Sequence, residues 1–106
     1  MRRVLATLPL LLLLTGFARS QPPQHVISQK EKAFSRSQIT VRAGEAIAFR
    51  NDDVVIHNVF STSPGFEFNL KKQAPGAAGA VPFRQRGSAQ VRCAFHPQMK
   101  LTVTVN

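Results

Sequence analysis

The sequence predicts an all-β fold, a small antiparallel β-sandwich or barrel of seven to eight short strands. Apolar residues recur with period two after residue 24, which is the spacing of half-buried strands. Seven Pro and six Gly break the chain at short intervals, as turns between strands require. No helical periodicity follows residue 20, and 106 residues suffice for one ordinary domain.

The first twenty residues are predicted to be a secretory signal peptide. Met1–Arg3 is basic, Val4–Phe17 is an apolar run of 14 residues, and Ala18–Ser20 supplies small residues for cleavage. The run is shorter than the roughly 20 residues of a membrane span, but a retained membrane anchor remains the alternative. We therefore expect an exported chain whose residues 21–106 form a single domain, with no stable membrane insertion after the signal is removed.

The first strands follow a flexible lead-in that begins at residues 21–24. His25 lies at the end of this lead-in and is expected to be solvated. Alternation places Ile39 and Val41 on one face of a strand. The next strand carries Ile47 and Phe49 and closes at the polar residues 51–53. An apolar strand over 54–60 then contains His57.

The second half of the chain alternates in the same way. A turn at 61–65 precedes a strand over 66–70, and small residues predict a loop over 73–80. A short strand over 81–83 is expected at a sheet edge, because Pro82 cannot donate to a ladder. The strand over 88–93 places Ala89, Val91 and Cys93 on one face, and the last strand spans 101–105.

Composition excludes several classes of protein. One cysteine excludes a disulfide framework and a four-cysteine zinc site. We find no Ser/His/Asp constellation, paired catalytic carboxylates or phosphate loop, so we do not expect an enzyme. The net charge of +9 is spread along the chain without a nucleic-acid-binding motif, so we expect no nucleic-acid partner. The basic residues are either a solvated surface or a means of steering an acidic partner.

Metal-binding side chains occur in two places. Cys93, His96 and Met99 lie within seven residues, between two predicted strands. His57 lies 36 residues upstream on another strand, and a sandwich can bring it to the same end of the molecule. Thiolate, thioether and imidazole together favour copper, and a trigonal His₂Cys set with a weak axial Met is the blue-copper arrangement, which serves electron transfer.

These residues resemble the cupredoxins, the small blue copper proteins that include plastocyanin, amicyanin and pseudoazurin. The spacing Cys93-x-x-His96-x-x-Met99 is similar to the short ligand loop of amicyanin and to exported plastocyanin-like domains labelled as methylamine-utilisation proteins. Residues 39–53 resemble the stretch before the first ligand of the family, and His57-Asn58-Val59 resembles the context of that ligand. The resemblance covers residues 24–106.

The resemblance implies a Greek-key cupredoxin-like fold around one type 1 copper ion. His57, Cys93 and His96 would be the equatorial ligands and Met99 the axial ligand. Asn58 would tie the two ligand loops together and donate its backbone N–H to the cysteine sulfur. His96, Pro97 and Phe95 would form the electron-exit and docking patch.

The expected function is electron transfer by an exported carrier in the bacterial periplasm. We expect a monomer whose partners are larger redox proteins with acidic docking surfaces, because a net positive field would steer such partners to it. The acidic patch of some plant cupredoxins is absent here. The alternative is a periplasmic copper-binding or copper-delivery protein for cuproenzyme assembly or copper resistance. The presence of only two Met, one of them the initiator, disfavours that alternative. A metal-free β-sandwich adhesion module is the weaker rival.

Overall fold

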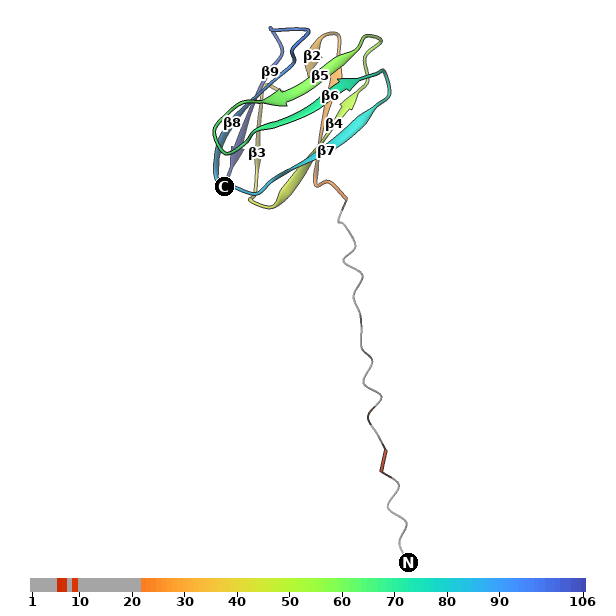
Figure 1. Cartoon of the computed structure of the whole chain (residues 1–106), viewed down its shortest axis with the longest axis vertical. Helices are drawn as coiled ribbons and strands as arrows, with labels where there is room; N and C mark the ends of the chain where they lie inside the picture. The colour runs from red at the N-terminus through yellow and green to blue at the C-terminus, as the bar shows by residue number, and fades with distance from the viewer. Residues whose placement is uncertain (1–5, 8, 10–21) are drawn as a thin grey trace, which may run out of the picture.

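Nine strands form two facing sheets in the computed structural model, which describes residues 6, 7, 9 and 22–106 (Figure 1). The predicted signal peptide therefore lies outside the described residues, apart from residues 6, 7 and 9. The strands are β1 (His25–Lys30), β2 (Ala33–Phe34), β3 (Gln38–Val41), β4 (Glu45–Asn51), β5 (His57–Ser61), β6 (Phe68–Gln73), β7 (Ala78–Phe83), β8 (Gly87–Arg92) and β9 (Lys100–Val105).

The strand order is β2-β1-β4-β7 in one sheet and β3-β9-β8-β5-β6 in the other. Two pairs, β1 with β4 and β3 with β9, are parallel, and the other pairs are antiparallel. The predicted all-β sandwich is confirmed. Its strand count is higher than the expected seven to eight, and its pairing is mixed rather than wholly antiparallel.

The core between the sheets follows from the alternation seen in the sequence. Successive strand residues point to opposite faces, so every second apolar side chain is buried. The fully or almost fully buried apolar side chains of β3, β4, β8 and β9 are Ile39, Val41, Ile47, Phe49, Ala89, Val91, Leu101, Val103 and Val105. Phe49 is fully buried, with its ring centroid 6.5 Å from that of Phe34 and 6.0 Å from that of Phe68.

Residues 25–34 form two strands that the sequence did not predict. Gln29 is fully buried on β1, and a buried polar residue interrupts the apolar alternation. The two-residue turn Glu31–Lys32 has φ values of 53° and 57°, which suits a tight hairpin. The expectation that His25 is solvated is wrong, since it is half-buried with its Nε2 3.1 Å from Glu45 Oε1.

Two predicted boundaries are also wrong. The strand expected over 54–60 begins only at His57, and residues 52–56 form a loop. The loop expected over 73–80 is confined to 74–77, because β7 begins at Ala78. Gly79 has a packing reason to be small, since a Cβ there would lie 3.2 Å from the Leu70 side chain. The expected edge position of 81–83 is confirmed, because β7 is an outer strand.

One end of the sandwich, which we call the ligand pole, is made by residues 51–57 and 93–99. The register pairs His57 with Gln73 and Arg92 with Lys100, so β5, β6, β8 and β9 all reach this pole. The distal pole, at the other end, holds the start of β1 and the end of β9 (Figure 1). In the part of the chain described here, no helix has the length and apolarity needed to cross a membrane.

Candidate metal centre

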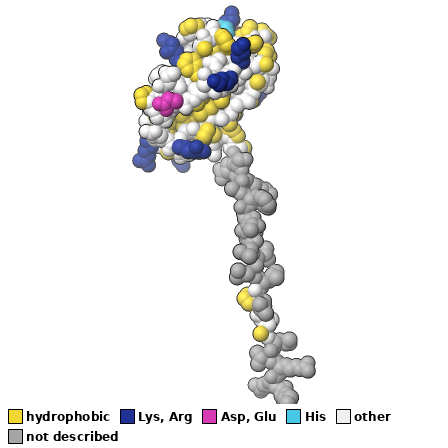
Figure 2. Space-filling model, viewed as in Figure 1, with side chains coloured by type: hydrophobic (Ala, Val, Ile, Leu, Met, Phe, Trp, Pro, Cys, Tyr) yellow, Lys and Arg dark blue, Asp and Glu magenta, His cyan; other side chains and the backbone are white. Residues whose placement is uncertain are grey.

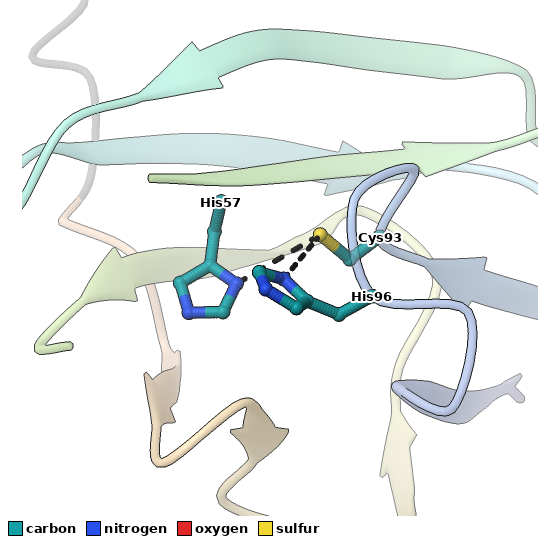
Figure 3. Close-up of side chains that lie close together, drawn as sticks. All are labelled: His57, Cys93 and His96. Carbon is teal, nitrogen blue, oxygen red and sulfur yellow. Dashed lines mark hydrogen bonds between the residues drawn. The ribbon is translucent and has the colours of Figure 1, made fainter. Parts of the chain in front are cut away.

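Three metal-ligating atoms converge at the ligand pole. Cys93 Sγ lies 3.8 Å from His57 Nδ1 and 3.7 Å from His96 Nδ1. All three atoms lie within 4.8 Å of one another, and both imidazole rings face the sulfur (Figure 3). Two segments that are 36 residues apart in sequence are thus brought to one point.

Local structure explains how each side chain reaches that point. Cys93 continues the inward face of β8 after Ala89 and Val91, and its exposure is only 2%. His57 is the first residue of β5 and is fully buried. His96 opens a turn in which the Met99 N–H donates to the His96 carbonyl at 2.9 Å. Pro97 occupies the second position of that turn, where its fixed φ is favoured.

The spacing fits a first-row metal ion. Metal–sulfur bonds of about 2.3 Å and metal–nitrogen bonds of about 2.0–2.1 Å, set about 120° apart, would separate sulfur and nitrogen by about 3.8 Å. The observed separations of 3.7 and 3.8 Å agree with that value. A thiolate with two imidazoles is a donor set that copper binds well.

Met99 is buried with 2% exposure and lies two residues before Leu101, on the inward face of the chain leading into β9. Its burial is compatible with an axial ligand and equally with a core side chain. The axial role of Met99 therefore stays a prediction.

Asn58 bonds to both β6 and the cysteine. Its backbone N–H donates to Cys93 Sγ at 3.3 Å. Its side-chain amide donates to Asn69 Oδ1 at 2.8 Å and to the Lys71 carbonyl at 3.0 Å. Both acceptors lie on β6, so this amide braces β5 against β6, whereas the resemblance implied a tie between the two ligand loops.

Sequence reasoning missed Asp53, which lies behind His57. Asp53 Oδ2 is 2.9 Å from His57 Nε2 and accepts the Lys32 backbone N–H at 2.9 Å. The Lys32 N–H, followed by the His57 ring, lowers the pKa of Asp53 to about 2, so its carboxylate is ionised at neutral pH. The only available signal was a carboxylate four residues before His57, and the 51–53 triplet was interpreted as a strand end.

His96 is only partly enclosed. Burial lowers its pKa below the ordinary value, and the neighbouring His57 and Lys32 lower it further. A lower pKa favours the neutral ring, which keeps a lone pair available for a metal.

Three exposed apolar side chains lie in the two loops that make the ligand pole. Val54, Ile56 and Phe95 are 90%, 49% and 48% exposed, and we call these three residues the apolar patch. Ile56 precedes His57 in the sequence and Phe95 precedes His96. The ring centroids of His57 and His96 lie 4.8 Å apart. Of the docking residues expected from sequence, Phe95 and Pro97 are exposed and His96 is half-buried. Val54 and Ile56 were missed because they were assigned to a strand.

Basic side chains adjoin the ligand pole, whose own loops carry the carboxylates of Asp52 and Asp53. Arg92 and Lys100 are cross-strand neighbours there, and Arg92 Nη2 lies 3.4 Å from the Pro97 carbonyl. Figure 2 shows Lys and Arg side chains scattered over the visible face of the domain, with yellow apolar side chains and a histidine at the end remote from the grey segment.

Comparison with known proteins places these features in a family. The description "Copper binding proteins, plastocyanin/azurin family" matches residues 24–106. The cofactor of that family is one copper ion, and His57, Cys93 and His96 lie close enough together to form its site. No curated protein matches the chain in sequence.

Solved structures agree in fold. A purple cupredoxin from Nitrosopumilus maritimus is 23% identical with a TM-score of 0.69, and the match covers 77% of this chain and 99% of that one. Amicyanin from Paracoccus versutus is 26% identical with a TM-score of 0.70, covering 84% and 87%. A copper-containing nitrite reductase from Thermus scotoductus is 19% identical with a TM-score of 0.74, covering 82% of this chain and 23% of that one. The same fold therefore occurs within an enzyme.

Proposed function

The chain belongs to the copper-binding plastocyanin/azurin family, and from this premise we propose that it is an exported blue copper protein that carries single electrons between larger redox proteins. The observation that carries the proposal is the convergence of His57 Nδ1, Cys93 Sγ and His96 Nδ1 at one pole. We propose these residues as the equatorial ligands and Met99 as the axial ligand.

A bound copper ion would supply a one-electron couple between Cu(II) and Cu(I). The protein holds the ligands so that little needs to move between the two states. His57 and Cys93 are buried among strands, and the Met99-to-His96 turn closes the ligand loop in four residues. The Asn58 N–H at Cys93 Sγ stabilises negative charge on the sulfur.

The partly exposed His96 and the apolar patch give a partner a short route to the site. Apolar side chains at an interface exclude water when a partner docks. We propose that electrons enter and leave at His96, with Phe95 and Pro97 beside it. The neighbouring cations Lys32, Arg92 and Lys100 favour a partner with an acidic docking surface, because charge complementarity speeds encounter. We propose a monomer, since one such pole per chain is sufficient for this role.

The direct test is the visible spectrum of the purified protein with one equivalent of Cu(II). A thiolate ligand predicts an intense charge-transfer band, and a reversible one-electron wave should accompany it. Cys93→Ser should abolish the band, while His57→Gln and His96→Gln should shift or weaken it.

His25→Gln is the matched control, because His25 is the remaining histidine and hydrogen-bonds Glu45 on β4 rather than the site. Its band should equal that of the unmodified protein. A colourless Cu(II) complex without a reversible wave would refute the carrier function. Efficient transfer of copper to an apo-acceptor, with no reversible wave, would instead support copper delivery.

Export is tested separately. We propose that residues 1–20 are removed and that residues 21–106 form the mature domain in the bacterial periplasm. Intact mass of protein recovered from a periplasmic extract should correspond to residues 21–106. A full-length mass in the membrane fraction would favour the retained anchor.

A further inference from the structure

The Asp53 carboxylate lies next to His57, is almost fully buried and is held by several hydrogen bonds. His57 is fully buried and the Asp53 side chain is only 8% exposed, with 2.9 Å between His57 Nε2 and Asp53 Oδ2. We propose that Asp53 is a positioning residue, which fixes the tautomer and orientation of His57 and lowers the reduction potential of the copper site. The part concerning potential rests on the proposed function.

The tautomer follows from hydrogen-bond chemistry. A carboxylate only accepts hydrogen bonds, so His57 Nε2 must donate to it and carries the ring proton. In a neutral imidazole the other nitrogen then has a free lone pair. That nitrogen is Nδ1, which faces Cys93 Sγ at 3.8 Å. The Asp53 contact therefore presents the correct atom of His57 to a metal.

Further hydrogen bonds hold the carboxylate itself in place. Oδ2 accepts the Lys32 N–H from the β1–β2 turn, and Oδ1 accepts the Val54 N–H at 2.8 Å. The Asp53 N–H donates to Asn51 Oδ1 at 2.9 Å. Both oxygens of Asp53 and its backbone are thus fixed without the imidazole.

Asn51 connects the hydrogen bonds around Asp53 to the interior of the domain. It is fully buried, and its amide donates to the Val55 carbonyl at 2.9 Å and to the Gln73 carbonyl at 2.8 Å. Asp53 therefore belongs to a hydrogen-bonded chain that runs from β6 through the 52–56 loop to His57. An orientation set in this way persists whether or not a metal is bound.

The sign of the effect on potential comes from charge. A buried negative group beside a ligand favours the more positive state of the metal, which is Cu(II). Removing that charge should favour Cu(I), so an external electrode should reduce the site more easily. Loss of such a supporting group changes metal affinity by about 10–100-fold.

The experiment compares Asp53→Asn and Asp53→Ala with Asp52→Asn. Asp52 is the adjacent carboxylate, which contacts Ser28 and Arg50 rather than His57, so its substitution makes the same charge change without touching the imidazole. Reduction potentials are measured on copper-loaded protein. For the metal-free protein, NMR of the ring nitrogens reports the His57 tautomer and the exchange rate of its Nε2 proton.

The Asp53 variants should shift the ratio of Cu(II) to Cu(I) affinity by about 10-fold or more toward Cu(I). This raises the potential by about 59 mV for each tenfold change in a one-electron couple. In Asp53→Ala, which has no acceptor for the ring proton, the His57 Nε2 proton should also exchange faster and the two His57 tautomers should mix. Asp52→Asn should stay near the unmodified protein in both measurements.

The outcomes separate the two proposals. If the unmodified protein forms the coloured, reversible copper site but Asp53→Asn and Asp52→Asn give equal potentials, or the His57 tautomer is unchanged in Asp53→Ala, the positioning role is overturned and the carrier function stands. If the unmodified protein forms no such site, both the carrier function and the effect on potential fail. If Asp53→Ala does not fold, the Asp53→Asn comparison decides.

Discussion

Serine substitutions in the apolar patch should slow electron self-exchange between copies of the protein, and Val54→Ser should do so with little change in stability. Val54 is 90% exposed and contributes little to the core, whereas Ile56 is 49% exposed and about half-buried. Full burial of such a side chain is worth about 1.5–3 kcal/mol. Scaled by exposure, docking over Val54 gains about 1.4–2.7 kcal/mol and over Ile56 about half of that.

Val54→Ser should therefore weaken the encounter complex about 10–100-fold, and Ile56→Ser less. Self-exchange is measured by NMR line broadening in mixtures of Cu(I) and Cu(II) protein at fixed ionic strength, so no partner needs to be identified. Val26→Ser is the matched control, because Val26 is 52% exposed but lies near the start of β1 at the distal pole. Equal rates for Val54→Ser and Val26→Ser would refute docking at the ligand pole.

Three further substitutions test other parts of the structure. Asn69→Ala removes one of the two acceptors of the Asn58 amide, so the free energy of unfolding should fall by about 0.5–1.5 kcal/mol. Copper should also dissociate faster, as stopped-flow chelation would show. Phe49→Ala empties a fully buried position and should cost about 3–5 kcal/mol in urea unfolding; a loss below about 1 kcal/mol would contradict the packing described. The pKa of Glu45 is lowered by the Arg42 N–H and then by His25, so its contribution to stability is present above pH 4.5 and is lost as pH falls below that value. Glu45→Gln should therefore flatten the fall in urea midpoint between about pH 6 and about pH 3.

The strands with regular alternation were predictable from sequence. In β3, β4, β8 and β9 the buried apolar side chains alternate along the strand, so periodicity predicts burial; Asn51 at the end of β4 is the polar exception. Pro82 likewise indicated the edge strand, because its missing N–H excludes a central position.

The wrong boundaries have physical causes. Val54 and Ile56 alternate like strand residues, but Asn51 and Asp53 bind the backbone of that segment, so no neighbouring strand pairs with it. In β7 the small residue Gly79 gives no apolar signal, yet it allows Leu70 to pack closely against it.

β1 was not predicted from the sequence, for a different reason. Gln29 is buried because its amide donates to Gln73 Oε1 at 2.8 Å, a contact between residues 44 positions apart. No pattern within one segment predicts a partner so distant. The residues brought together at the metal site were predictable because ligand chemistry restricts them to Cys, His and Met. Asp53 was not, since its role depends on the path of the loop.

Both ends of the described domain lie at the distal pole. β1 begins there, and Asn106 accepts the Ala43 N–H at 2.8 Å beside the turn between β3 and β4. A tether or fusion joined at either end would leave the redox-active surface facing outward. Attachment to an electrode through the N-terminal side of residue 22 would hold the copper end toward solution, where a soluble partner could still collide with it.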